Sequence, residues 1–198
     1  GLLRRQRQMC IRDSLYGLSM LYLWAGSLQF NVLAEQFVIN GTDPLPLIAM
    51  GFVLVGFGFK VSAAPFHFAA PDAYAGASSP IAGILATASK AMGIIGLLRM
   101  LLIVAAPEAS EDGTVWLTLL GVLSLVTMTW GNIAALGSTN PKRMLAYSSV
   151  AHAGYMLAAI TAIGAWNWDA SFAGDAGESA VAVLTALIFH PVSYTHLR

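Results

Sequence analysis

The chain has 198 residues, of which 57% are hydrophobic and only 10% are charged. An average soluble domain has roughly 25% charged residues, so this composition excludes a soluble globular enzyme, a disordered chain and a basic nucleic-acid-binding protein. Ten basic and ten acidic residues balance each other, so the net charge does not indicate a partner. The mean hydropathy is +0.69. We therefore expect an all-α, polytopic transmembrane helix bundle of about six helices, since one span needs about 20 apolar residues.

The two ends of the chain differ from its body. Residues 1–14 carry four of the seven arginines, and residues 191–198 end an apolar run that begins near Ala180. Both segments resemble translated adapter sequence, and we expect them to be non-native tails. A basic juxtamembrane arm is the alternative for residues 1–14. The single cysteine, Cys10, lies in the first tail, so the body offers no disulfide or thiol chemistry.

Apolar runs separated by helix breakers predict six spanning segments. They cover residues 15–34, 46–70, 80–105, 114–136, 143–165 and about 179–190.

Pro65 lies inside the second segment. A proline in a helix interior lacks a donor and clashes with the carbonyl four residues earlier, here that of Val61. We therefore expect a broken helix, with free carbonyl groups that favour a cation and admit water.

The charges of the predicted loops divide between the two sides of the membrane. The loops after the first, third and fifth segments carry eight acidic residues and no lysine or arginine. The loops after the second and fourth segments carry Asp72, Lys142 and Arg143. Because cytoplasmic loops are enriched in lysine and arginine, we expect the second group on the cytoplasmic side. The body without its tails has five basic and nine acidic residues and is net acidic.

Two lysines fall near the middle of predicted spans. A charge at the bilayer centre costs about 3 kcal/mol or more, so it needs a partner, water or a function. Lys60 precedes the expected break, too deep for a snorkelling side chain, and we interpret it as functional. Lys90 lies among small residues, where desolvation disfavours its charged form and suits a proton carrier. A fixed ion pair with an acid is the alternative for Lys90.

Two histidines and one arginine also lie in or beside these spans. His152 has a similar depth to the lysines, and an imidazole titrates near neutral pH. Two roles are open for the His152 side chain: it relays protons, or it forms a hydrogen bond to a neighbouring backbone carbonyl. His67 follows the break and is a weaker candidate for the cytoplasmic end of a water path. Arg99 is expected to reach the interface or to pair with an acid. No acid lies inside any predicted span, so a carboxylate partner for Lys60 would come from outside this chain.

Two long sequence blocks resemble a known family. GFGFKVSAAPFHFAAPDAYAGASSPIAGILATASKA covers residues 56–91, and WGNIAALGSTNPKRMLAYSSVAHAGYML covers residues 130–157. Both are similar to signatures of the antiporter-like membrane subunits of respiratory complex I, an NADH–quinone oxidoreductase, and the second points more closely to one of these subunits. The resemblance implies two inverted five-helix repeats, each with a discontinuous helix. Residues 15–105 would end the first repeat, and residues 106–190 would start the second.

The resemblance also implies a function and candidate site residues. Such a subunit moves protons across the bacterial inner membrane while the complex oxidises NADH and reduces quinone, and it is a translocase subunit without a redox centre. Lys60 matches the lysine of the first broken helix, Lys90 the central lysine of the next, and His152 the histidine of the YSS-x-AH-x-GY block. Flavin, iron–sulfur clusters, NADH and quinone would belong to the wider complex. The partners would be other membrane subunits, including neighbouring antiporter-like ones, and lipid.

Two alternatives remain open. A subunit of a related cation/proton antiporter or of a membrane-bound hydrogenase would share the lysines and the broken helix. A structural membrane scaffold with fixed ion pairs would not pump at all. The family's glutamate partner for Lys60 and a later lysine of the second repeat have no counterpart in this sequence. We therefore expect an internal fragment that does not pump by itself.

Overall fold

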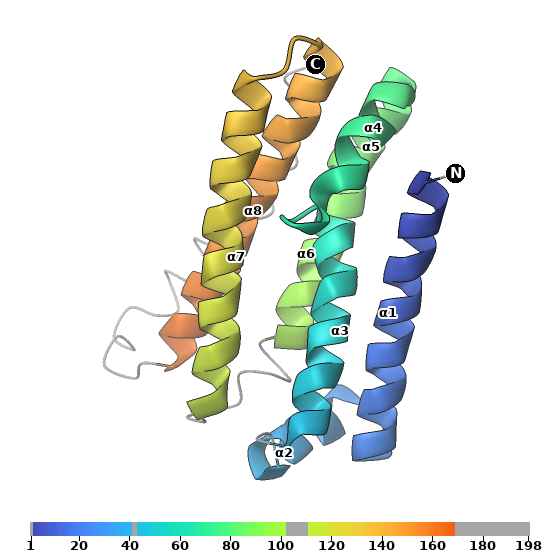
Figure 1. Cartoon of the computed structure of the whole chain (residues 1–198). Helices are drawn as coiled ribbons and strands as arrows, with labels where there is room; N and C mark the ends of the chain where they lie inside the picture. The colour runs from blue at the N-terminus through green and yellow to red at the C-terminus, as the bar shows by residue number, and fades with distance from the viewer. Residues whose placement is uncertain (1, 41–42, 102–110, 169–198) are drawn as a thin grey trace.

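The computed structural model describes residues 2–40, 43–101 and 111–168, and within these ranges the regular structure is entirely helical (Figure 1). The elements in chain order are α1 (Leu2–Ala25), α2 (Phe30–Asn40), α3 (Pro44–Val61), the 3-10 turn η1 (Phe66–Phe68), α4 (Ala69–Gly76), α5 (Ser79–Ala86), α6 (Ala88–Met100), α7 (Glu111–Leu136) and α8 (Pro141–Trp168). The predicted all-α bundle is confirmed. The sixth predicted segment, 179–190, lies outside the described residues.

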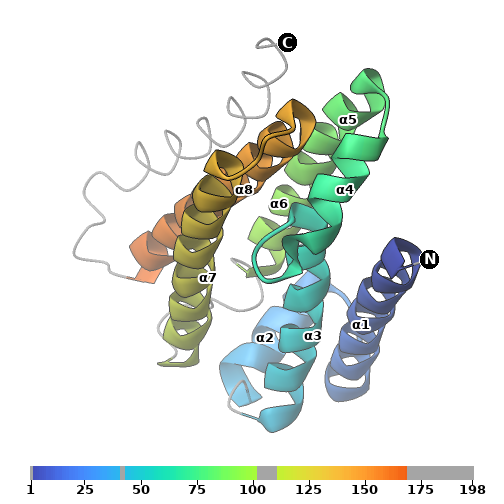
Figure 2. The same cartoon turned by 45° about the horizontal axis from the view of Figure 1, so that its top comes forward.

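The helices form two groups that lie side by side. Helix α1 packs along α3, and α6 packs against α3 in the same group, whereas α7 and α8 form a long antiparallel pair (Figures 1 and 2). Helix α4 contacts α8 and thereby connects the two groups at one end of the bundle. The short α2 lies at the opposite end.

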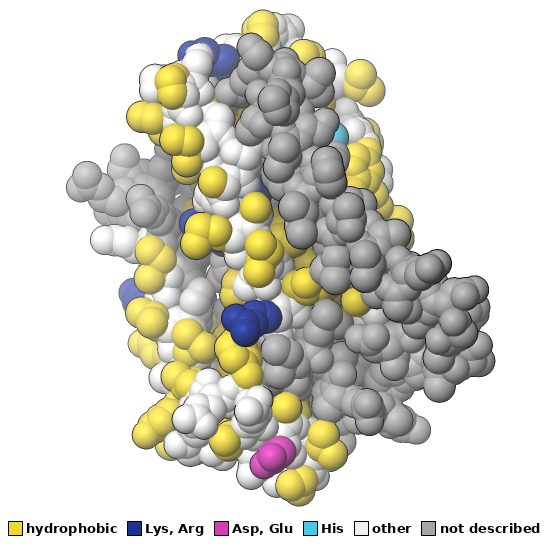
Figure 3. Space-filling model, turned by 180° about the vertical axis from the view of Figure 1, so that it is seen from behind, with side chains coloured by type: hydrophobic (Ala, Val, Ile, Leu, Met, Phe, Trp, Pro, Cys, Tyr) yellow, Lys and Arg dark blue, Asp and Glu magenta, His cyan; other side chains and the backbone are white. Residues whose placement is uncertain are grey.

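Three stretches of the described chain are long and apolar enough to cross a membrane: Pro44–Gly76, Ser79–Met100 and Trp116–Leu136. They correspond to the second, third and fourth predicted segments. On the rear face, hydrophobic side chains are spread over the described part and charged groups are sparse (Figure 3). Such a surface is compatible with contact with the lipid of a bilayer. Large apolar side chains are exposed on the described helices. Met92 is 74% exposed and Ile84 is 63% exposed.

The first predicted segment, expected as one helix over 15–34, is two helices instead. Helix α1 ends at Ala25, and Gly26 adopts a φ of +71°. The Gly26 N–H donates to the carbonyl of Tyr22 at 2.8 Å. A glycine closes a helix in this way because it lacks the Cβ that disfavours positive φ. The chain then turns, and α2 starts at Phe30.

The third predicted segment, expected as one helix over 80–105, is interrupted. Thr87, with a ψ of −77°, separates α5 from α6. Its N–H and its hydroxyl both donate to the carbonyl of Gly83, at 3.1 Å and 2.9 Å. Side-chain bonding of a threonine to the preceding turn competes with regular helix hydrogen bonding. The interruption places Lys90 in the first turn of α6.

The break before Pro65 is confirmed, and two carbonyl groups of the last turn of α3 accept hydrogen bonds from the residues that follow. Helix α3 ends at Val61, and Ser62 takes a left-handed conformation with a φ of 65°. The N–H groups of Ser62 and Ala63 donate to the carbonyls of Phe59 and Gly58, at 3.2 Å and 2.8 Å. The turn therefore satisfies two of the carbonyls that the helix end leaves without an intrahelical partner.

The break is also fastened to the second helix group. The Ala64 N–H donates to the hydroxyl of Thr127 on α7 at 3.0 Å, and that hydroxyl donates to the carbonyl of Leu123 at 2.6 Å. Thr127 is fully buried. A buried N–H without such a partner would be unfavourable, so α7 fixes the position of the broken segment.

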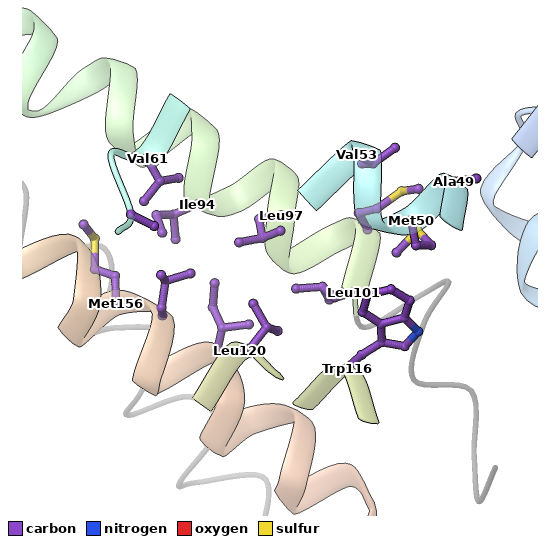
Figure 4. Close-up of a cluster of buried hydrophobic side chains, with 14 of the residues drawn as sticks. Ala49, Met50, Val53, Val61, Ile94, Leu97, Leu101, Trp116, Leu120 and Met156 are labelled. Atoms are coloured by element: carbon purple, nitrogen blue, oxygen red, sulfur yellow. The ribbon is translucent and has the colours of Figure 1, made fainter. Parts of the chain in front are cut away.

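The apolar core lies between the two helix groups. Figure 4 shows Ile94 and Leu97 of α6 facing Leu120 of α7 and Met156 of α8, and all four are buried. Helices α7 and α8 approach closely, because a Cβ on Gly131 would come within 2.6 Å of the Ala151 nitrogen. Small residues permit this close contact between membrane helices.

Candidate functional site

Lys90 is the central group of the candidate site. It is only 2% exposed, although it carries a charged side chain. Its Nζ donates hydrogen bonds of 2.6 Å to both the carbonyl oxygen and the hydroxyl oxygen of Ser149 on α8. These bonds join α6 to α8 across 59 positions of the sequence. Hydrogen bonds with one charged partner are the stronger kind, so Ser149 holds the amine in place.

An aromatic ring completes the described surroundings of Lys90. The Nζ lies 5.9 Å from the centroid of the Tyr74 ring, which is within cation–π range. The Tyr74 hydroxyl donates to the carbonyl of Leu85 at 3.2 Å, which anchors the ring between α4 and α5. Within the described ranges no acidic side chain forms a salt bridge with Lys90, and the ion pair found there joins Asp72 to Arg143. The amine is therefore surrounded by neutral acceptors and a π face.

Lys60 is placed differently from Lys90, because its side chain is exposed. It lies near the end of α3, and its stem runs across Gly93 of α6. A Cβ on Gly93 would be 3.1 Å from the Lys60 Cγ. Gly93 follows Lys90 by about one helical turn, so the Lys60 stem lies against the part of α6 that carries Lys90.

A cavity of about 640 Å³ receives the Lys60 side chain. It lies between α1, α3 and α6, and its lining is mainly apolar, with Phe57, Val53 and Met100 among the residues involved. Arg99 lines the same cavity, so two cations share it. No acid is among the lining residues of the described chain. Arg99 was expected to reach the interface or to pair with an acid, and the structure places it beside this cavity.

His152 follows Ser149 on α8 by three residues, which puts the two side chains on one helix face. It is half-buried, and its ring meets Tyr155 edge-on at a centroid distance of 5.7 Å. Lys60, Lys90 and the Ser149–His152 face thus lie on α3, α6 and α8 in succession.

His67 lies in the broken segment, next to α7. It is 5% exposed and stacks on Phe68 with a centroid distance of 4.7 Å, and the Trp130 ring lies 6.0 Å away. Its Nδ1 is buried and has no hydrogen-bond partner in the described part of the chain. The structure thus places His67 among aromatic rings, with one ring nitrogen available to a small polar molecule.

Two residues of the site were missed by sequence reasoning, Ser149 and Tyr74. Both lie in the quoted sequence blocks, but a serine or a tyrosine in an apolar helix carries no local signal of its partner. Only the packing of α4 and α8 around α6 brings them to Lys90. In the described residues, no group of three or more His, Cys, Asp or Glu side chains could hold a metal ion.

Comparison with known proteins identifies relatives over almost the whole chain. Residues 14–195 match the family described as NADH:quinone oxidoreductase/Mrp antiporter, transmembrane. NADH-quinone oxidoreductase subunit N of Heliobacterium modesticaldum is 47% identical over 143 residues, which are 72% of this chain and 29% of the relative. The subunit N 2 of Roseiflexus castenholzii is 42% identical over 170 residues, which are 84% of this chain and 33% of the relative.

Solved structures are similar in fold. A chain of respiratory complex I from Thermus thermophilus is 33% identical, with a TM-score of 0.63, over 90% of this chain and 37% of that one. A chain of the Mrp complex from Dietzia sp. has a TM-score of 0.70 at 20% identity, over 82% of this chain and 30% of that one, which shows the shared fold alone. The chain therefore spans about a third of the length of the proteins it matches.

Proposed function

Because the chain belongs to the NADH:quinone oxidoreductase/Mrp antiporter transmembrane family, we propose that it is part of a proton-translocating membrane subunit of an NADH–quinone oxidoreductase. The subunit is of the N type, as the 42% and 47% identical relatives suggest. It moves protons through Lys60, Lys90 and His152, with His67 as a weaker member, and this movement is coupled to quinone reduction in the complex.

The buried contact between Lys90 and Ser149 carries this proposal. A lysine held by a carboxylate would have to break an ion pair in order to lose its proton. Lys90 is held by neutral oxygens, and a hydroxyl can both accept and donate a hydrogen bond. The Ser149 hydroxyl can therefore bond to the charged and to the neutral amine, which suits a proton carrier.

Lys60 supplies the charge that controls Lys90. Its stem lies against Gly93, about one turn from Lys90, so a positive charge on Lys60 raises the free energy of a second charge on Lys90. A carboxylate from the remainder of the full-length subunit would reduce this repulsion when it pairs with Lys60. When that pair opens, the proton leaves Lys90 toward His152 on the next helix.

The redox chemistry belongs elsewhere in the complex. NADH, flavin, iron–sulfur clusters and quinone would be bound by other subunits, since the chemistry proposed for this chain is proton movement alone. Other membrane subunits, including antiporter-like neighbours, would be its protein partners, and the bacterial inner membrane its location. By the positive-inside rule the end with Asp72 and Arg143 faces the cytoplasm.

Lysine variants of the full-length subunit in the assembled complex test the proposal. We expect Lys90→Ala and Lys60→Ala to lower the number of protons moved per NADH oxidised, measured in sealed membrane vesicles. Met92→Ala is the matched control, because Met92 lies two residues after Lys90 on the exposed face of α6. Normal proton stoichiometry in both lysine variants would contradict the proposal.

The same measurement distinguishes the alternatives. A structural scaffold predicts that the lysine variants lower the amount of assembled complex, while each assembled complex pumps normally. A cation/proton antiporter predicts cation-driven proton movement without NADH oxidation. The identity to subunit N relatives favours the redox-driven complex.

A further inference from the structure

Tyr74 of α4 contacts Lys90 of α6 with the face of its aromatic ring. The Lys90 Nζ lies over this ring, 5.9 Å from the centroid, and Lys90 is only 2% exposed. The negative face of an aromatic ring attracts a cation, and the attraction is stronger where the pair is removed from water. The contact therefore lowers the free energy of the charged amine relative to the neutral amine.

The Tyr74 ring is fixed in this position by its own hydroxyl group, which donates to the carbonyl oxygen of Leu85 at 3.2 Å. Leu85 is the last residue but one of α5, and carbonyls in the last turn of a helix lack intrahelical partners. The interruption at Thr87 therefore has two consequences for the site. It ends the helix that supplies the acceptor for Tyr74, and it starts the helix that carries Lys90.

The hydrogen bonds of Lys90 leave the choice between its two protonation states to another group. A charged amine has three donors, and within the described ranges two of them bond to the carbonyl and the hydroxyl of Ser149. The hydroxyl can bond to either form of the amine, because it both donates and accepts. The π face attracts mainly the charged form. Tyr74 therefore discriminates between the two forms more sharply than the Ser149 hydroxyl does.

The other charged groups on the surrounding helices do not supply this stabilisation. A charge on Lys60 disfavours a charge on Lys90, because like charges repel. Asp72, two residues before Tyr74 on α4, forms an ion pair of 3.0 Å with Arg143. The remaining titratable or charged side chains on α3, α6 and α8 are Arg99, Lys142, Tyr147, His152 and Tyr155. In the described part of the chain, no acid forms a salt bridge with Lys90, so the ring takes the place of a counterion.

We propose that Tyr74 is a positioning residue for proton translocation: its ring stabilises the protonated form of Lys90 by a cation–π contact and so sets the pH range in which Lys90 carries a proton. The proposal deepens the proposed function and rests on it for the role of Lys90 as a carrier. The contact itself is a separate physical property, because an aromatic face stabilises a neighbouring cation whether or not that cation exchanges its proton.

The pH profile of proton translocation tests the role of the ring. Tyr74→Leu, in the full-length subunit of the assembled complex, removes the π face and keeps an apolar side chain. We expect the number of protons moved per NADH oxidised to fall at a pH about 0.5 to 1.5 units lower than in the parent, because the charged form of Lys90 loses a stabilising contact. Tyr22→Leu is the matched control, since Tyr22 is 58% exposed on α1, and its profile should not move. An unmoved profile in Tyr74→Leu would overturn the proposal.

Graded changes of the ring separate its charge distribution from its shape. Tyr74→Phe keeps the face but loses the bond to the Leu85 carbonyl, and it should move the profile less than Tyr74→Leu. Phenylalanine with one, two or three ring fluorines, incorporated at position 74, makes the face progressively less negative with little change in size. We expect the shift to grow with each fluorine. Equal profiles for the four phenylalanine variants would show that the ring only fills space. This series decides the matter if Tyr74→Leu does not assemble.

Thermal unfolding measures the contact without reference to pumping. Lys90→Met removes the charge and keeps a long side chain, so Tyr74→Leu should lower the melting temperature of the complex more in the parent than in the Lys90→Met background. Equal decreases in both backgrounds would contradict the contact. If the decreases differ but Lys90→Met pumps normally, the proposed function fails and the contact stands. If Lys90→Met stops pumping while the Tyr74 variants leave the pH profile unmoved, only the role of Tyr74 fails.

Discussion

Lys90 of α6 and Ser149 of α8 are joined by two hydrogen bonds of 2.6 Å, one to the serine carbonyl and one to its hydroxyl. The contact ties the helix with the buried charge to the helix that carries His152. Because the backbone carbonyl provides one of the two bonds, part of the contact is independent of the side chain at position 149. The hydroxyl provides the part that can respond to the protonation state of the amine.

Replacing this hydroxyl tests its contribution. Ser149→Ala removes one hydrogen bond to a charged group, which is worth about 1.5–3 kcal/mol. We expect a lower melting temperature of the assembled complex and a lower rate of proton translocation. Ser148→Ala is the control, since Ser148 is adjacent but is not bonded to Lys90. Identical behaviour of the two variants would show that the carbonyl alone positions the amine.

The attachment of the broken segment to α7 gives a second prediction. Thr127→Val keeps the shape of the side chain but leaves the buried Ala64 N–H without its 3.0 Å acceptor. An unsatisfied buried donor costs about 1–3 kcal/mol, so the melting temperature should fall. Thr127→Ser retains the hydroxyl and should be close to the parent. A valine variant as stable as the serine variant would mean that the N–H finds another acceptor.

The close approach of α7 and α8 gives a third prediction, measured in the same thermal assay. At Gly131 a new Cβ would lie 2.6 Å from the Ala151 backbone nitrogen, so the helices must move apart. We expect Gly131→Ala to destabilise by about 1–3 kcal/mol, as overpacking does. At Gly121 of the same helix the nearest atom would be the Thr161 Cγ2 at 3.6 Å. Gly121→Ala should be neutral or stabilising, because alanine favours helix.

The ion pair between Asp72 and Arg143 gives a fourth prediction, of a small effect. Its atoms are 3.0 Å apart, but the side chains are 54% and 49% exposed. Exposed pairs contribute about 0–1 kcal/mol and are screened by salt. A double-mutant cycle of Asp72→Asn and Arg143→Gln should therefore give a coupling energy below about 1 kcal/mol that decreases in salt. A coupling of several kcal/mol would show that the pair is shielded from water in the complex.

Several features could be predicted from the sequence because their causes are local. Pro65 breaks the second span since a proline lacks an N–H and clashes with the preceding turn. The order of the predicted spans put Asp72 and Arg143 in loops on the same side, and their ion pair joins them at one end of the bundle across 71 positions of the sequence. Apolar runs predicted the helices, because a bilayer leaves few other structures possible.

Other local details were not predicted. The helix end at Gly26 and the interruption at Thr87 divide segments that are continuous in hydropathy. Hydropathy averages over many residues, so it does not register a single positive φ or one hydroxyl bonded to the preceding turn. In both places the backbone hydrogen bonds, rather than the apolar pattern, determine where the helix stops.

The sequence by itself determined that two lysines lie deep in apolar helices, because depth follows from counting residues along a helix. Only the tertiary structure decided that Lys90 is buried against Ser149 while Lys60 is exposed in a cavity with Arg99. The direction in which a side chain points, and the partner it meets, depend on how α3, α6 and α8 pack. That packing is a long-range property, since the contacts of Lys90 join residues 59 positions apart.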